Sequence, residues 1–105
     1  MEAVTELVAG KPVVIFGKSN CFVSPTVEAL ISSFGANPVV YHLDTMPNGQ
    51  RIESALSQLD RQPAKGPAVF IGQEYIGGAN AITTLHVRNE LVPRLLRANA
   101  IFIWR

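Results

Sequence analysis

Two residues three positions apart carry the chemistry that this sequence offers. Cys21 is the only cysteine among the 105 residues, and Ser24 follows it in the segment GKSNCFVSPT. A thiolate at Cys21 could attack a disulfide, and Ser24 stands where a second cysteine would close an intramolecular one. A hydroxyl can hydrogen-bond a thiolate but cannot resolve a mixed disulfide. A mixed disulfide at Cys21 therefore needs an external thiol, for which glutathione is the abundant intracellular candidate.

The elements around Cys21 are expected to make its sulfur reactive. The apolar run at 13–16, ended by Gly17, predicts a buried strand, and the apolar spacing over 27–34 predicts a helix. A site between a strand's carboxyl end and a helix N-terminus is a favoured ligand position. Unpaired N–H groups, the helix dipole and the nearby Lys18 would lower the pKa of the thiol below that of a free cysteine. An inert buried cysteine is the alternative, and the preceding Gly-Lys-Ser-Asn turn argues against it.

The start of this helix can be placed in two registers. Ser24 followed by Pro25 fits a helix cap and first helical residue, which would leave Cys21 one turn upstream of the dipole. If Cys21 is the cap instead, Pro25 removes one early hydrogen bond and Ser24 supports the thiolate. We favour the second register, and the choice decides how acidic the thiol is.

The rest of the chain predicts an α/β domain with a four-stranded mixed sheet flanked by helices. A helical crossover should make the first two strands parallel, and the last two should form an antiparallel hairpin. The apolar spacing predicts helices at 3–9, 27–34, 52–59, 80–85 and 91–96, and strands at 13–16, 39–43, 68–71 and 75–76. Neither a repeat nor a linker divides the chain, so we expect one domain over residues 1–105.

Net charge and cysteine content indicate which binding partners and which cellular compartment to expect. The formal net charge of +1 leaves no electrostatic basis for direct binding of nucleic acid or a membrane surface. A single cysteine fits a reducing compartment, and we find neither a signal peptide nor an apolar run long enough to span a bilayer. We therefore expect a cytoplasmic protein, with the nucleus as the alternative. His42 and His86 have no second ligand at metal spacing, so we expect them to be structural or solvent-facing.

Several segments, taken in order, resemble a glutaredoxin of thioredoxin fold. The likeness runs from about Lys11 to Phe102 and includes KSNCFVS after VVIFG, a VFIG strand preceded by proline, and GGAN opening a helix. The stretches PVVYHLDTMPNGQRIESAL, PAVFIGQEYIGGAN, TLHVRNELVPRLL and ANAIF are similar to the plant-specific CC-type class. With serine at position 24, the chain resembles a monothiol Cys-x-x-Ser variant of that class.

The resemblance implies a role for each matching position. It makes Cys21 the nucleophile that attacks glutathionylated substrates, and Pro67 a cis-proline that faces it. Lys18 would lie near the glycyl carboxylate of glutathione, and the γ-glutamyl carboxylate would meet a helix start. Lys65 and Gly66 would pair their backbone with the cysteinyl unit. The implied glutathione-binding residues are Lys18, Phe22, Lys65, Gly66, Pro67, Gly78, Ala79 and Asn80.

The chain also departs from the CC-type pattern. Phe22 replaces a second cysteine, Pro25 replaces a usual histidine, and Lys65-Gly66-Pro67 replaces Thr-Val-Pro. The resemblance implies docking to TGA-type bZIP transcription factors through the C-terminal segment. That segment departs from the pattern at Arg94 and in the tail IFIWR.

The residues around Cys21 and the resemblance to glutaredoxins together favour two alternative functions. The first is a monothiol oxidoreductase that reduces glutathione mixed disulfides on glutathionylated proteins through Cys21. The second is a non-catalytic redox regulator that binds glutathione, a [2Fe–2S] cluster or a transcription factor. A cluster takes four sulfur ligands, which Cys21 from each of two chains and two glutathiones would supply.

Overall fold

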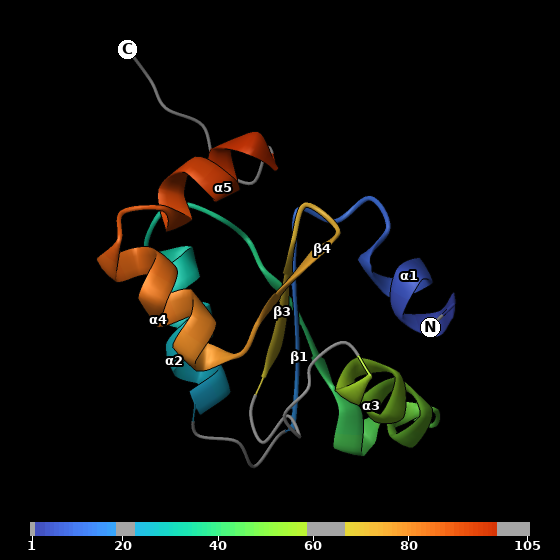
Figure 1. Ribbon diagram of the computed structural model, residues 1–105. Coiled ribbons are helices and arrows are strands. Elements are labelled where there is room, and N and C mark those ends of the chain that lie inside the picture. The colour runs from blue at the N-terminus through green and yellow to red at the C-terminus, as the bar shows by residue number, and fades with distance from the viewer. Residues whose placement is uncertain (1, 19–22, 59–66, 99–105) are drawn as a thin grey trace.

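The computed structural model describes residues 2–18, 23–58 and 67–98 (Figure 1). The helices and strands follow the predicted order, with one short 3₁₀ helix added. They are α1 Glu2–Val8, β1 Val13–Gly17, α2 Val23–Ser32, β2 Val39–His42, the 3₁₀ helix η1 Leu43–Thr45, α3 Gly49–Ser57, β3 Ala68–Ile71, β4 Glu74–Gly77, α4 Ala79–Val87 and α5 Leu91–Arg97.

The four strands form one mixed sheet in the order β2-β1-β3-β4. β1 and β2 are parallel, with Val14 opposite Val39, and β1 pairs antiparallel with β3, with Val13 opposite Ile71. β3 and β4 are antiparallel and joined by Gly72 and Gln73, which both have positive φ angles of 61° and 69°. A two-residue loop with both φ angles positive suits the twist of a hairpin. The predicted parallel pair and hairpin are thus both confirmed.

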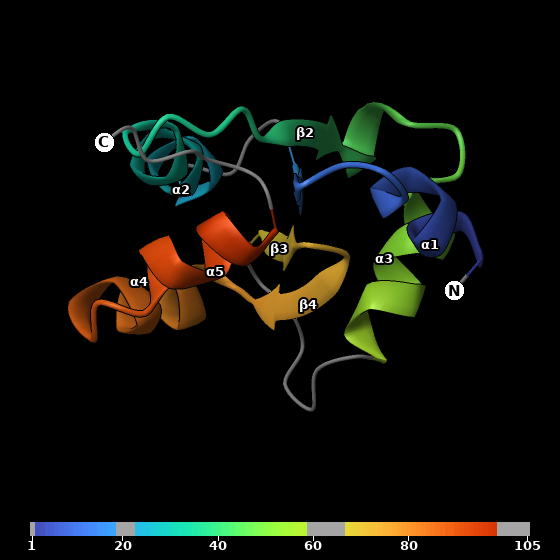
Figure 2. The same cartoon turned by 90° about the horizontal axis from the view of Figure 1, so that it is seen from above.

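Helices cover both faces of the sheet, so the sheet lies in the middle of the domain (Figure 2). Val13 and Ile15 of β1 point into a core shared with α2, α4 and α5. Val14 and Phe16 point into a second core shared with α1 and α3. Alternate residues of a strand face opposite sides, so a strand covered on both faces must be apolar throughout. This explains the uninterrupted run VVIF.

The chain leaves β2 one residue earlier than the sequence predicted. Leu43, expected to end the strand, begins η1 instead, and its side chain is buried in the core beside α3. The Thr45 hydroxyl donates a hydrogen bond of 2.9 Å to the His42 carbonyl oxygen, which stabilises this turn. η1 then packs against Gly49, where an added Cβ would overlap the Leu43 carbonyl oxygen. The close approach at Gly49 fixes the first turn of α3 against the end of β2.

Candidate functional site

Sheet topology brings the described candidate residues to one edge of the sheet. β1 ends at Gly17, followed by Lys18, and the antiparallel β3 begins at this edge, with Phe16 opposite Ala68. β4 runs back to the same edge, with Gly77 opposite Val69. The end of β1, the start of β3 and the end of β4 meet at this edge (Figure 1). Lys18, Pro67 and the Gly78–Asn80 turn, which adjoin these strand ends, therefore share it although they lie far apart in the sequence.

Pro67 and Gly78 lie directly against each other. Pro67 is among the fully buried side chains, and its carbonyl oxygen lies 3.3 Å from where a Cβ on Gly78 would be. Glycine at position 78 therefore allows β3 and the start of α4 to approach closely. The peptide bond before Pro67 includes Gly66, which lies outside the described residues, so the cis-proline remains a prediction.

A β-bulge turns the chain from β4 into α4. Phe70 is opposite Tyr75 and Val69 is opposite Gly77, so Ile76 is the extra residue on β4. Gly77 then has a φ angle of 135°, and a Cβ there would lie 2.7 Å from the Cβ of Ala81. Bulges of this kind redirect a strand next to functional sites. The bulge and Gly77 together place the first turn of α4 beside Pro67.

The first turn of α4 is suited to an anion. Its cap residue is Gly78, which has no side chain with which to cap the amides of Ala79, Asn80 and Ala81. The dipole of the helix adds a partial positive charge at this end. Asn80 is exposed in this first turn, and its carbonyl oxygen accepts a 2.8 Å hydrogen bond from the Thr84 hydroxyl. A carboxylate is the chemistry that such a helix start receives.

Lys18 is exposed at the end of β1, and it forms an ion pair that the sequence did not suggest. Its Nζ lies 3.3 Å from Oε1 of Glu53 on α3, and both side chains are about half exposed, at 49% and 46%. The pair borders a cavity of about 490 Å³ at the carboxyl ends of β1 and β2. The cavity is lined by Lys18, Leu43, Asp44, Met46, Pro47, Asn48, Gln50, Arg51 and Glu53.

The start of α2 lies between the two predicted registers, because the position before Val23 is 22, which is neither Ser24 nor the favoured Cys21. α2 begins at Val23, so Ser24 has helical backbone and is not the residue before the helix. Pro25 lies in the first turn, where a missing N–H removes no hydrogen bond within the helix. The helix thus starts closer to Cys21 than a Ser24 cap would allow. Cys21, Phe22, Lys65 and Gly66 lie outside the described residues, so their predicted roles remain predictions.

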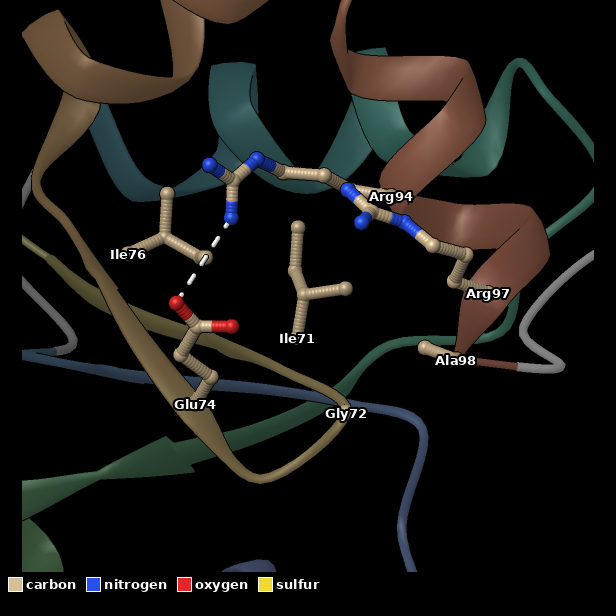
Figure 3. A pocket seen from close by; sticks show the side chains of 7 residues that line it. All are labelled: Ile71, Gly72, Glu74, Ile76, Arg94, Arg97 and Ala98. Carbon is tan, nitrogen blue, oxygen red and sulfur yellow. Dashed lines mark ion pairs between the residues drawn. The ribbon is translucent and has the colours of Figure 1, made fainter.

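The leucine run of α5 packs into the core. Leu91 and Leu95 are 1% and 0% exposed and contact the sheet face shared with α2 and α4. Arg94, where the CC-type pattern has leucine, points outward and pairs with Glu74 of β4 at 3.7 Å (Figure 3). The buried leucines stabilise the fold and are not a free docking surface. The tail that would complete the transcription-factor contact lies outside the described residues.

Within the described part of the chain, the structure contains neither a group of side chains that could bind a metal ion nor a membrane-spanning helix. No three His, Cys, Asp or Glu side chains there come together in a way that could hold a metal ion. None of the helices in those ranges is long and apolar enough to cross a bilayer.

The mixed β2-β1-β3-β4 sheet, covered by helices on both faces and with a buried proline beside a glycine turn, defines a protein of thioredoxin fold. No family model matches the chain. Individual proteins do match. The chain is 54% identical to monothiol glutaredoxin-S6 and 52% identical to monothiol glutaredoxin-S1, both of Arabidopsis thaliana. Each match covers 103 residues, 98% of this chain and 100% of the relative.

A solved structure agrees with these relatives. The crystal structure of a buckwheat glutaredoxin–glutathione complex matches with a TM-score of 0.89 and 33% identity, over 96% of this chain and 91% of that one. The chain belongs to the glutaredoxin family. The predicted resemblance and the predicted thioredoxin fold are both confirmed.

Proposed function

We propose that the chain is a monothiol oxidoreductase that uses glutathione to reduce glutathione mixed disulfides through Cys21. The observation that carries the proposal is the gathering of Lys18, Pro67 and the α4 start at one edge of the sheet. In the sequence, Cys21 lies between Gly17, the last residue of β1, and Val23, the first residue of α2. The buckwheat relative, which is similar in fold, was crystallised with glutathione.

Glutathione carries two carboxylates and a thiol, and the edge offers a partner for each carboxylate. The γ-glutamyl carboxylate would bind the amides at the start of α4, where Gly78 leaves them uncapped. The glycyl carboxylate would approach Lys18 on the other side of β1. Lys65 and Gly66 would pair their backbone with the cysteinyl unit between them, and Phe22 and Pro67 would flank it.

The reaction then runs in two thiol–disulfide exchanges. The Cys21 thiolate attacks the glutathione sulfur of a mixed disulfide, so a Cys21–glutathione disulfide forms and the target thiolate leaves and takes up a proton. A second glutathione thiolate attacks the glutathione sulfur of that intermediate. Glutathione disulfide is released and the Cys21 thiolate is restored. The reaction consumes one free glutathione, and the disulfide bond passes from the target to glutathione disulfide, so no other reductant is needed.

The residues around Cys21 support its ionised form. α2 begins at Val23, two positions after the sulfur-bearing residue, so the positive end of its dipole is close in the chain. Ser24 would contribute a hydroxyl donor but no second thiol. The intermediate therefore persists until external glutathione arrives. A supply of reduced glutathione agrees with a cytoplasmic protein, or with a nuclear one.

A deglutathionylation assay tests the proposal. A glutathionylated peptide is mixed with glutathione, and the glutathione disulfide produced is followed through NADPH consumption by glutathione reductase. The wild-type chain should exceed the uncatalysed rate, and Cys21→Ser should not. Wild-type activity equal to that of Cys21→Ser would refute the proposal.

A [2Fe–2S] cluster bridging two chains is the second candidate function. Each chain has a single cysteine, so the four sulfur ligands of the cluster would be two Cys21 side chains and two glutathiones held at this same edge. Anaerobic reconstitution with iron and sulfide tests it. A coloured dimer that is lost in Cys21→Ser would support it, and a colourless monomer would refute it.

A further inference from the structure

We propose that Glu53 determines the affinity of the site for glutathione by competing with the glycyl carboxylate for Lys18. The inference rests on the proposed function, since it concerns the same site. It adds a specificity-determining residue on α3, which is not among the glutathione-binding residues that the resemblance to glutaredoxins implies.

The competition follows from the ion pair. Oε1 of Glu53 lies 3.3 Å from the Lys18 Nζ, so the ammonium already has a carboxylate partner before any ligand arrives. An ammonium has three N–H donors, so Glu53 does not use up the hydrogen bonds of Lys18. Glu53 instead neutralises its charge, and a glycyl carboxylate at Lys18 would lie within a few ångströms of a second negative charge. Like charges at such separations repel and weaken binding.

The fold holds Glu53 in this position. Ile52, Ala55 and Leu56 bury one face of α3 in the core, and Gly49 is packed against the Leu43 carbonyl oxygen. A helix fixed at its first turn and along its inner face has little freedom to rotate Glu53 away from the end of β1. The side chain, at 46% exposure, keeps some freedom, so the competition weakens binding without blocking the site.

The charges that line the cavity also indicate that Glu53 weakens the binding of an anion. Its lining contains two cations, Lys18 and Arg51, and two carboxylates, Asp44 and Glu53, so the formal charges cancel. A neutral lining gives little attraction for an anionic ligand. Replacing Glu53 by glutamine leaves a net charge of +1 at the same cavity, with the shape of the side chain preserved.

Calorimetric titration of reduced glutathione into the reduced, full-length chain tests the proposal. An exposed ion pair contributes about 0.2–1 kcal/mol, so Glu53→Gln should tighten binding by about 1.5- to 5-fold. Glutathione monoethyl ester, in which the glycyl carboxylate is esterified, should bind both proteins equally. The control is Glu74→Gln, which breaks an exposed ion pair with Arg94 at the far end of β4 and changes the net charge equally (Figure 3). It should leave the affinity unchanged.

The outcomes separate this inference from the proposed function. If glutathione binds and Lys18→Ala weakens it, but Glu53→Gln has no effect or tightens the ester equally, the inference is overturned and the proposed function stands. An equal gain in Glu74→Gln would also overturn it, because a general charge effect would then suffice. If neither wild type nor Glu53→Gln binds glutathione, both the inference and the proposed function fail.

Discussion

Gly77→Ala should destabilise the domain through the turn that positions the start of α4. The φ angle of Gly77 is 135°, in a region where a residue with a side chain is strained by about 1–3 kcal/mol. The new Cβ would also lie 2.7 Å from the Cβ of Ala81, and overpacking of this kind costs about 1–3 kcal/mol. We therefore expect the free energy of unfolding to fall by about 2–6 kcal/mol, the sum of these two costs.

A matched glycine separates the two costs. Gly35 also has a positive φ angle, of 93°, but nothing lies within 4 Å of its added Cβ. Gly35→Ala should therefore show only the backbone strain of about 1–3 kcal/mol. Adding Ala81→Gly to Gly77→Ala removes the overlapping methyl group, so the pair should show a favourable coupling in a double-mutant cycle.

Urea denaturation followed by circular dichroism gives all of these values from midpoints and slopes. The deglutathionylation assay, run on the same variants, reports whether the site moves with the turn. If Gly77→Ala cost no more than Gly35→Ala, or if Ala81→Gly failed to recover part of the loss, the contact with Ala81 would not be a constraint and the reasoning would be wrong.

Two further predictions concern α3 and Lys18. Gly49→Ala should lower the free energy of unfolding by about 3 kcal/mol or more, since its Cβ would overlap the Leu43 carbonyl oxygen and the backbone must shift. Urea denaturation measures this loss, and a value under about 1 kcal/mol would contradict the prediction. Lys18→Ala should raise KM for a glutathionylated peptide by a few fold with little change in kcat, because Lys18 would bind ground and transition states alike. Steady-state kinetics measure this, and a fall in kcat at constant KM would speak against a pure binding role.

Much of the fold could be predicted because its signals are local. β1 is covered on both faces and therefore reads as the unbroken run VVIF, and the helical crossover to β2 implies a parallel pair. The turn η1 was missed because Leu43 is apolar and follows a strand-like run, so nothing in its type separates the end of β2 from the start of a buried turn. Tertiary packing against α3 decides that position.

The site could be predicted only in part. Lys18, Pro67 and Gly78 were predicted from their place in recognisable motifs, and the sheet places them at one edge, while their roles in binding stay predictions. Glu53 was missed because it lies 35 positions from Lys18 and belongs to no motif. One signal was available: the segments that follow two adjacent parallel strands meet at the same edge of a sheet, so charges after β1 and β2 should have been compared.

The proposed function requires Cys21 to be a reactive thiolate at the start of α2, and the pH dependence of its alkylation by iodoacetamide measures this property. Because the thiolate is the species that reacts, the rate follows its population, and Cys21 is the only cysteine in the chain. If the start of α2 stabilises the thiolate, the rate should be half-maximal at a pH well below the value of about 8.5 that a free cysteine shows. A midpoint at or above that value, or a sulfur that iodoacetamide does not reach in the folded protein, would contradict it.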